Sequence, residues 1–101
     1  MNPQRNGDAR FRLTLMSAAT TQLAAILRRA QAIGRRTDVI AAARRIDRRL
    51  RMDARSFGEP IKSHPDAQID ERRAAIAPLV VYYGVHLEQP EVFIREFRGL
   101  L

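Results

Sequence analysis

The sequence has no cysteine and only two histidines, and all but one of its 18 cationic residues are arginine, Lys62 being the exception. The absence of cysteine excludes disulfide bonds, thiolate nucleophiles and cysteine zinc sites, and two histidines alone make a poor metal site. No apolar run is long enough to cross a bilayer or to form the centre of a signal peptide. We therefore expect a soluble cytoplasmic protein with no metal, no small-molecule cofactor and no membrane partner.

Positive charge is the strongest compositional signal. The formal net charge is +7 and the pI is about 11.4, a field that attracts polyanions. The guanidinium group adds a planar fork that grips phosphate oxygens in pairs, which an ammonium group cannot do. The charge therefore favours nucleic acid or an acidic protein as the partner over a merely solvated surface.

The length of 101 residues predicts one domain with one core. Residues 1–10 contain proline, glycine and polar residues without an apolar period, so they are predicted to form a mobile tail. Residues 11–101 then form the single domain.

The first half of this domain has the pattern of a strand followed by two helices. Apolar residues alternate from Phe11 to Leu15, the period of a half-buried strand. An apolar stripe of 3.6-residue period follows, with Ser17 as its expected N-cap and Gly34 where a C-terminal cap glycine belongs. A second stripe begins after Thr37 and Asp38, which predicts an antiparallel helical hairpin.

The second predicted helix carries arginines on the side opposite its apolar stripe. From residue 28 to residue 55 there are ten arginines and three aspartates, whereas a solvated helix face normally mixes charges of both signs. Among them, the expected nucleic-acid contacts are Arg44, Arg45, Arg48 and Arg49.

The second half has the pattern of a loop followed by antiparallel strands. Residues 54–71 contain glycine, prolines and serines and are predicted to form a long loop. The β-branched and aromatic run from Val80 to Val85 predicts a strand, which Pro78 separates from the strand before it. Residues 87–90 form a turn, and 92–97 return as an antiparallel partner. Because side chains alternate along a strand, Tyr82 and Tyr83 face opposite sides, with Tyr83 expected in the core.

The predicted fold class is therefore α+β. An N-terminal strand and an antiparallel helical hairpin pack on a small antiparallel sheet of three to four strands. This order, over about nine tenths of the chain, resembles the RelE/ParE superfamily of bacterial toxin-antitoxin toxins. The resemblance rests on the opening strand, the run Ala-Ala-Arg-Arg-Ile-Asp-Arg-Arg-Leu, the following Phe-Gly-Glu-Pro, the pair Arg72-Arg73, and Pro-Leu-Val-Val-Tyr-Tyr-Gly-Val leading into Val-Phe-Ile-Arg-Glu-Phe.

The resemblance implies a bacterial cytoplasmic toxin that an acidic antitoxin protein silences, with one of two targets. A RelE-like toxin cleaves messenger RNA in the ribosomal A site, which requires a base for the 2′-hydroxyl, cations for the phosphate and an acid for the leaving 5′-oxygen. A ParE-like toxin poisons DNA gyrase and needs no such set. A third hypothesis, a non-catalytic basic binding module on the same fold, remains open beside these two.

The resemblance to RelE-like nucleases implies catalytic roles for a few residues of this sequence. Arg72 or Arg73 matches the arginine that such nucleases place on the scissile phosphate, and Lys62 resembles their loop lysine. The nuclease pattern continues past the last strand to a tyrosine or a histidine-tyrosine pair, whereas this sequence ends at Leu101. Either Tyr83 or His86 supplies the acid or stacking residue instead, or cleavage is lost. Two further arginines, Arg95 and Arg98, extend the predicted positive surface.

Overall fold

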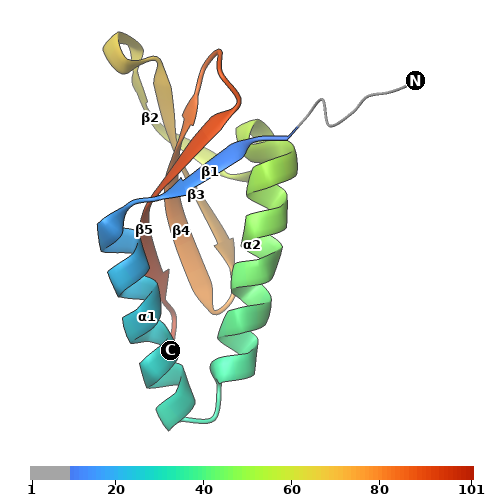
Figure 1. Ribbon diagram of the computed structural model, residues 1–101, viewed down its shortest axis with the longest axis vertical. Helices are drawn as coiled ribbons and strands as arrows, with labels where there is room; N and C mark the ends of the chain where they lie inside the picture. Colours follow the sequence, from blue (N-terminus) through green and yellow to red (C-terminus); the bar gives the residue numbers. More distant parts are fainter. Residues whose placement is uncertain (1–9) are drawn as a thin grey trace, which may run out of the picture.

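The computed structural model describes residues 10–101, so the predicted tail lies almost wholly outside the described residues (Figure 1). The predicted domain from residue 11 onwards contains two long helices and five strands. In chain order the elements are β1 (Arg12–Leu15), α1 (Ser17–Ala32), α2 (Arg36–Phe57), β2 (Glu59–His64), the 3₁₀ turn η2 (Pro65–Ala67), β3 (Ile69–Ile76), β4 (Leu79–His86) and β5 (Glu91–Gly99).

The two predicted helices are present, but their N-cap residues differ from the predicted ones. Helix α1 begins at Ser17 itself, so its N-cap is Met16, and the N-cap of α2 is Arg35; neither cap residue makes a side-chain hydrogen bond to its helix. Gly34 has a φ of 73°, the left-handed conformation that favours glycine just after a helix. Asp38 lies in the first turn of α2 as expected and accepts a hydrogen bond from Arg35.

The sheet has five strands in the order β1-β5-β4-β3-β2 and is mixed, because β1 runs parallel to β5 while the other pairs are antiparallel. The prediction of three to four antiparallel strands was therefore wrong in strand number and in direction. The helical hairpin between β1 and the rest of the chain provides the long crossover that a parallel neighbour requires.

Strand β2 is the element that the predicted loop concealed. Helix α2 extends to Phe57, and Glu59–His64 then pairs antiparallel with β3, with an irregularity between Pro60 and Lys62. Proline is tolerated there because β2 is an edge strand. Most of β2 is exposed, so it lacks the apolar alternation from which a strand is recognised.

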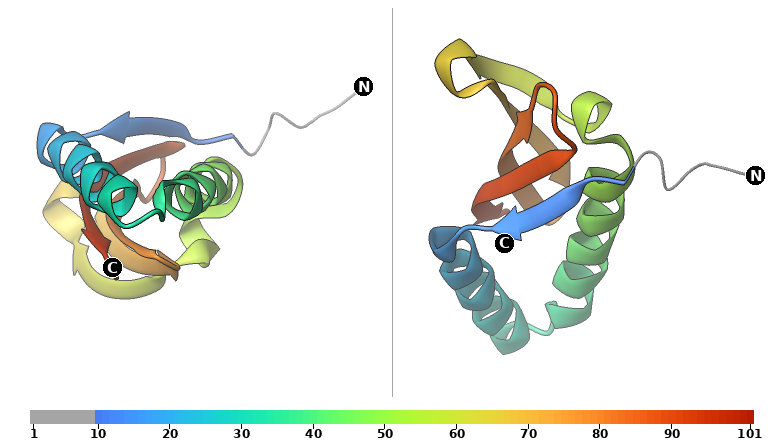
Figure 2. Two further views of the ribbon diagram at one scale, coloured as in Figure 1. Left: turned by 90° about the horizontal axis from the view of Figure 1, so that it is seen from below. Right: turned by 45° about the horizontal axis from the view of Figure 1, so that its top comes forward.

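Both helices lie on the same side of the sheet (Figure 2), because each has an apolar stripe to bury. Val39, Ile46 and Leu50 of α2 are buried, as is Ile26 of α1. Alternate residues of the central strand meet them, namely Leu79, Val81, Tyr83 and Val85. The prediction that Tyr83 belongs to the core is confirmed, since its side chain is fully buried. Within residues 10–101, neither helix is long and apolar enough to span a bilayer.

Candidate site on the uncovered face of the sheet

The sheet face that points away from the helices carries histidine, lysine, arginine, glutamate and tyrosine side chains from four strands. Strand register places them in three rows across the sheet, which together we call the uncovered face. The first row is His64, Ile69 and His86; the second is Lys62, Glu71, Gly84 and Phe93; the third is Glu59, Arg73, Tyr82 and Glu96. Residues paired across strands share a face, so each row is a line of neighbours.

Three charged or titratable side chains meet on this face, and we call them the His64 cluster. The Nε2 atom of His64 lies 3.0 Å from a carboxylate oxygen of Glu71. The other carboxylate oxygen of Glu71 accepts a hydrogen bond from Arg95. The side chain of Glu71 is only 18% exposed, whereas those of His64 and Arg95 are 40% and 54% exposed. The carboxylate is thus held between two groups that remain open to solvent.

Gly84 makes this meeting possible. It lies in the second row between Glu71 and Phe93, so no side chain stands between β3 and β5 at that point. A Cβ atom there would come within 2.9 Å of Ile69 Cγ2. Above Gly84 lies an open hollow of about 430 Å³, a size typical of small-ligand sites. It is lined by Met16, His64, Ala67, Ile69, Gly84, Phe93 and Arg95.

Two further cations on the uncovered face have no acidic partner. Within residues 10–101, neither Lys62 nor Arg73 takes part in an ion pair, and both are exposed. Arg98, by contrast, pairs with Glu96 at 2.7 Å and lies over the ring of Tyr82, 5.1 Å from its centroid. The hydrogen bond to Glu96 raises the pKa of Arg98. Lys62 and Arg73 are therefore the cations most available to an incoming anion.

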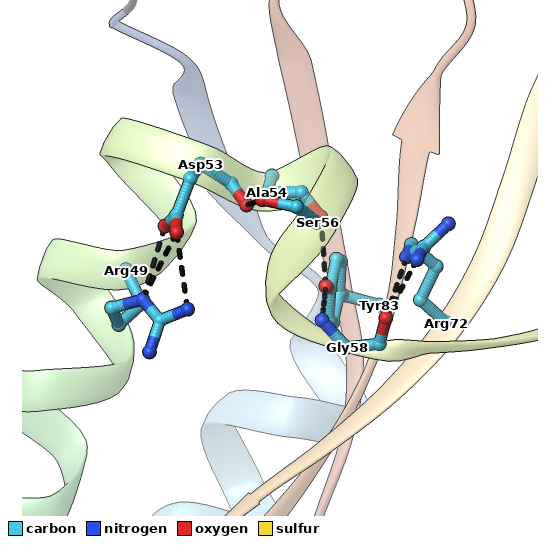
Figure 3. A network of polar contacts seen from close by, with 7 residues as sticks. All are labelled: Arg49, Asp53, Ala54, Ser56, Gly58, Arg72 and Tyr83. Atoms are coloured by element: carbon cyan, nitrogen blue, oxygen red, sulfur yellow. Dashed lines mark hydrogen bonds and ion pairs between the residues drawn. The ribbon is translucent and has the colours of Figure 1, made fainter.

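Two predicted catalytic residues lie on the helix side instead, in what we call the Tyr83 network (Figure 3). The Tyr83 hydroxyl accepts a hydrogen bond from the Gly58 amide at 2.9 Å and donates one to the Ala54 carbonyl at 2.8 Å. Arg72 donates to the Gly58 carbonyl through both Nε and Nη2, at 3.1 and 2.6 Å. The Tyr83 network therefore ties the end of α2 and the start of β2 to the sheet.

Burial raises the pKa of Tyr83 above its ordinary value of 10.0, an effect that the Gly58 amide and the nearby Arg72 partly offset. The ring also stacks on Phe57, with 6.3 Å between centroids. Both bonding directions of the hydroxyl are in use and the side chain is fully buried. Tyr83 therefore cannot reach a substrate in this structure, and its part in the fold is structural.

His86 also has a structural task. Its Nδ1 atom accepts hydrogen bonds from the amides of Glu88 and Gln89, at 3.1 and 2.9 Å. Arg55 donates to the carbonyls of His86 and Gln89, at 2.9 and 3.2 Å, which fixes the same turn to α2. The accepting nitrogen of His86 is thus occupied by the turn between β4 and β5.

The predicted nucleic-acid contacts on α2 fall into two groups. Arg49 pairs with Asp53 at 3.0 Å and lies over the ring of Phe57, and the hydrogen bond to Asp53 raises its pKa. Arg44, Arg45 and Arg48 are exposed and have no ion pair within residues 10–101. The α2 arginines and the uncovered face belong to opposite sides of the sheet, so the structure separates the predicted residues into two basic surfaces.

Sequence reasoning missed His64, Glu71, Gly84 and Phe93. His64 precedes a proline in what seemed a loop, and Glu71 was placed where the sheet begins, without a partner. A signal was available in the alternation of Lys62 and His64 with Ser63, which predicts one shared face if residues 59–64 are read as a strand. Residues 62–64 pair with β3 in regular register, and the irregularity shifts only Glu59 and Pro60. The pairing was missed because residues 59–64 were interpreted as a loop.

Comparison with family models, with curated proteins and with solved structures finds no significant match. Within residues 10–101, no group of three or more histidine, aspartate or glutamate side chains is placed to hold a metal ion. A function has to be inferred from the geometry and charge of the two surfaces.

Proposed function

We propose that this protein is a toxin-like protein of the RelE/ParE kind that binds RNA through the uncovered face and acts on messenger RNA at the ribosome. The observation that carries the proposal is the placement of Lys62, Arg73 and Arg95, from three strands, on one face of the sheet, where Arg95 and Phe93 line a hollow. Cations on neighbouring strands follow a phosphate backbone, and an aromatic ring offers a base a stacking surface.

The architecture supports the same proposal. An N-terminal strand, a helical hairpin and a sheet follow one another in the order that the resemblance leads us to expect. The two outer strands leave the sheet open at both edges. No described helix lies over the uncovered face, so an extended strand of RNA has direct access to it (Figure 2).

An acidic antitoxin is the protein partner we propose, and the helical hairpin offers it a surface. Two adjoining hollows of about 310 and 190 Å³ lie along the hairpin and share Ala43 and Asp47 in their linings. Their other lining residues are mostly apolar, and Arg44 and Arg48 stand at the edge. Unpaired arginines beside an apolar groove favour an acidic amphipathic segment, because such a segment satisfies both features.

A non-catalytic binding module is the second candidate, and a specific observation favours it. Arg72, Tyr83 and His86, three of the five residues predicted to be catalytic, use their polar atoms to hold the fold together. An RNA-binding module needs only the cations and the ring. A gyrase inhibitor needs neither a base nor RNA affinity, so a protein that arrests growth without binding RNA would point to gyrase.

Two matched double variants test the proposed RNA-binding surface. Lys62→Ala with Arg73→Ala removes two unpaired cations from the uncovered face, and Arg44→Ala with Arg48→Ala removes two from α2. Affinity falls as salt rises, and each phosphate contact on a single strand contributes about 0.7 to the steepness of log affinity against log salt. We therefore expect the first pair to make this dependence shallower by roughly 1 to 1.5. The control pair should leave the slope unchanged. Fluorescence anisotropy with a labelled single-stranded RNA measures both, and equal losses in the two variants would contradict the proposal.

A growth assay tests the toxin part separately. Induced expression of the wild-type chain in a bacterium should arrest growth, and the Lys62 and Arg73 double variant should relieve the arrest. Unimpaired growth with the folded wild-type protein present would overturn the toxin assignment while leaving RNA binding intact.

A further inference from the structure

We propose that His64 is a general base for RNA cleavage, taking the proton from a 2′-hydroxyl while Glu71 orients its ring. The proposal rests on the proposed function and names the residues, His64 and Glu71, that would act in RNA cleavage on the uncovered face. It is motivated by the contact between His64 and Glu71 beside the hollow over Gly84.

The hydrogen bond to Glu71 defines which nitrogen of His64 carries the proton. An ionised carboxylate accepts hydrogen bonds only, so the proton of the neutral ring must be on Nε2. The Nδ1 atom then holds a free lone pair. Within residues 10–101, no hydrogen bond to Nδ1 of His64 is found. His86 differs, since its Nδ1 is occupied by two backbone amides of the turn.

The groups around His64 suit an anionic transition state. Arg95 uses one guanidinium nitrogen for Glu71 and has other N–H groups left to donate. Lys62 is the cross-strand neighbour of Glu71, and Arg73 follows on the same face of β3. Arg73 lies further along β3, opposite Glu59, so the two cations next to Glu71 are Lys62 and Arg95. Two cations against one partly buried carboxylate leave positive charge beside His64, which stabilises the charge that develops on a phosphate under attack.

The hollow provides a place for the nucleotide. Phe93 and Ile69 form its apolar part, and His64 and Arg95 its polar part. A base stacked against Phe93 would place its ribose and phosphate towards the polar side. Stacking of this kind stabilises a bound base and tolerates any sequence.

The reaction balances without a further reactant. The 2′-oxygen bonds to phosphorus as its proton moves to Nδ1 of His64, and the bond from phosphorus to the 5′-oxygen breaks. The leaving 5′-oxygen takes a proton from water, and the resulting hydroxide recovers the proton from His64. The products are a 2′,3′-cyclic phosphate and a 5′-hydroxyl end, and the protein returns to its starting state.

The test follows cleavage and binding together, with the RNA alone and with messenger RNA on ribosomes. Wild-type protein should yield 2′,3′-cyclic ends. His64→Ala should lower the cleavage rate of bound RNA, measured at saturating protein, at least 100-fold, in line with the 10²–10⁴-fold contribution of a general base. Added imidazole should restore part of the rate in His64→Ala, which a purely structural role for His64 would not allow.

Glu71→Gln tests the positioning role and has a matched control. It should lower kcat about tenfold or more with KM nearly unchanged, because Glu71 acts through His64 and does not touch the substrate. Asp38→Asn makes the same kind of change in the ion pair with Arg35 at the start of α2 and should leave kcat unaltered. Equal losses in the two variants would overturn the assignment of Glu71.

The outcomes separate this inference from the proposed function. RNA that is bound but never cut, alone or on ribosomes, overturns the role of His64 and leaves the binding proposal standing. Cleavage that survives in His64→Ala also overturns it. A protein that binds no RNA overturns both proposals.

Discussion

The Tyr83 network and the His64 cluster lie on opposite faces of the same sheet and are built from similar parts. The Tyr83 network contains Tyr83 of β4 and Arg72 of β3, and the His64 cluster contains His64 of β2 and Arg95 of β5. In the Tyr83 network, the hydroxyl has both a donor and an acceptor and is fully buried. In the His64 cluster, one ring nitrogen and most of one guanidinium remain without a partner among the described residues.

The two sites differ in whether their polar atoms are free to bind a ligand. Buried polar groups that satisfy one another contribute to stability and are costly to disturb. Exposed groups that leave donors and acceptors unused contribute little to stability but can meet a ligand. Substitutions in the Tyr83 network should therefore change stability, whereas substitutions in the His64 cluster should change binding and catalysis.

Gly58→Ala should have the largest effect on stability. A Cβ atom at Gly58 would come within 2.7 Å of the Arg73 carbonyl oxygen and 2.8 Å of the Tyr83 hydroxyl. Because a backbone atom cannot move aside cheaply, we expect unfolding free energy to fall by roughly 2 to 3 kcal/mol, as for an overpacked core. Urea unfolding followed by circular dichroism measures it. A loss below about 0.5 kcal/mol would show that the backbone around Gly58 is not tightly packed and would contradict the structural role of the Tyr83 network.

Tyr83→Phe should have the next largest effect. Removing the hydroxyl leaves the Gly58 amide and the Ala54 carbonyl without their partner, which costs about 1 to 3 kcal/mol when such groups stay buried. The same urea experiment applies. RNA binding by the folded variant should be unchanged, and weakened binding would show that Tyr83 contributes to the ligand site after all.

The pH dependence of the same variant gives an independent check. The pKa of Tyr83 is raised by burial above its ordinary value of 10.0, so the unfolded chain loses this proton before the folded one does. The stabilisation is complete below pH 10 and is lost as pH rises from there through the folded pKa. Wild-type stability should therefore fall more steeply above pH 10 than that of Tyr83→Phe, and parallel curves would contradict the assigned protonation.

Gly84→Ala should have the smallest effect on stability, although the new Cβ atom is also close to a neighbour. The contact is with Ile69 Cγ2 at 2.9 Å, which can be relieved only by rotating the partly exposed Ile69 side chain about χ1, whereas at Gly58 the nearest atom belongs to the backbone. We expect a loss of less than about 1 kcal/mol, with weaker RNA binding because the methyl group projects into the hollow. A stability loss equal to that of Gly58→Ala would remove the distinction between the two faces.

The sequence predicted the elements with strong apolar patterns. The stripes of α1 and α2 and the β-branched run of β4 became the expected elements, because each buries an apolar face. The alternation before α1 became β1, although within that strand Leu13 is only partly buried and Leu15 is exposed. Strand β2 was missed since it is an exposed edge that buries almost nothing, and the parallel pairing of β1 with β5 depends on distant contacts that no local pattern contains.

The candidate site was less predictable than the fold. The basic residues Lys62 and Arg73 were expected to contact an anion, and both lie on the uncovered face, a placement that leaves their function to be tested. The register places Arg72 and Arg73 on opposite faces, as alternation along a strand requires. The contacts of His64 with Glu71 and of Glu71 with Arg95 join three strands, so they depend on strand order and on the missing side chain at Gly84.

The most direct test of the account is a nuclear magnetic resonance titration of ¹⁵N-labelled protein with a short single-stranded RNA whose 2′-hydroxyls are methylated to prevent cleavage. The account predicts that the largest amide shifts fall on the uncovered face, at Lys62, Glu71, Arg73, Gly84 and Phe93, with small changes along α2. Shifts confined to the amides of Arg44, Arg45 and Arg48 would contradict it and move the binding surface to the helical hairpin.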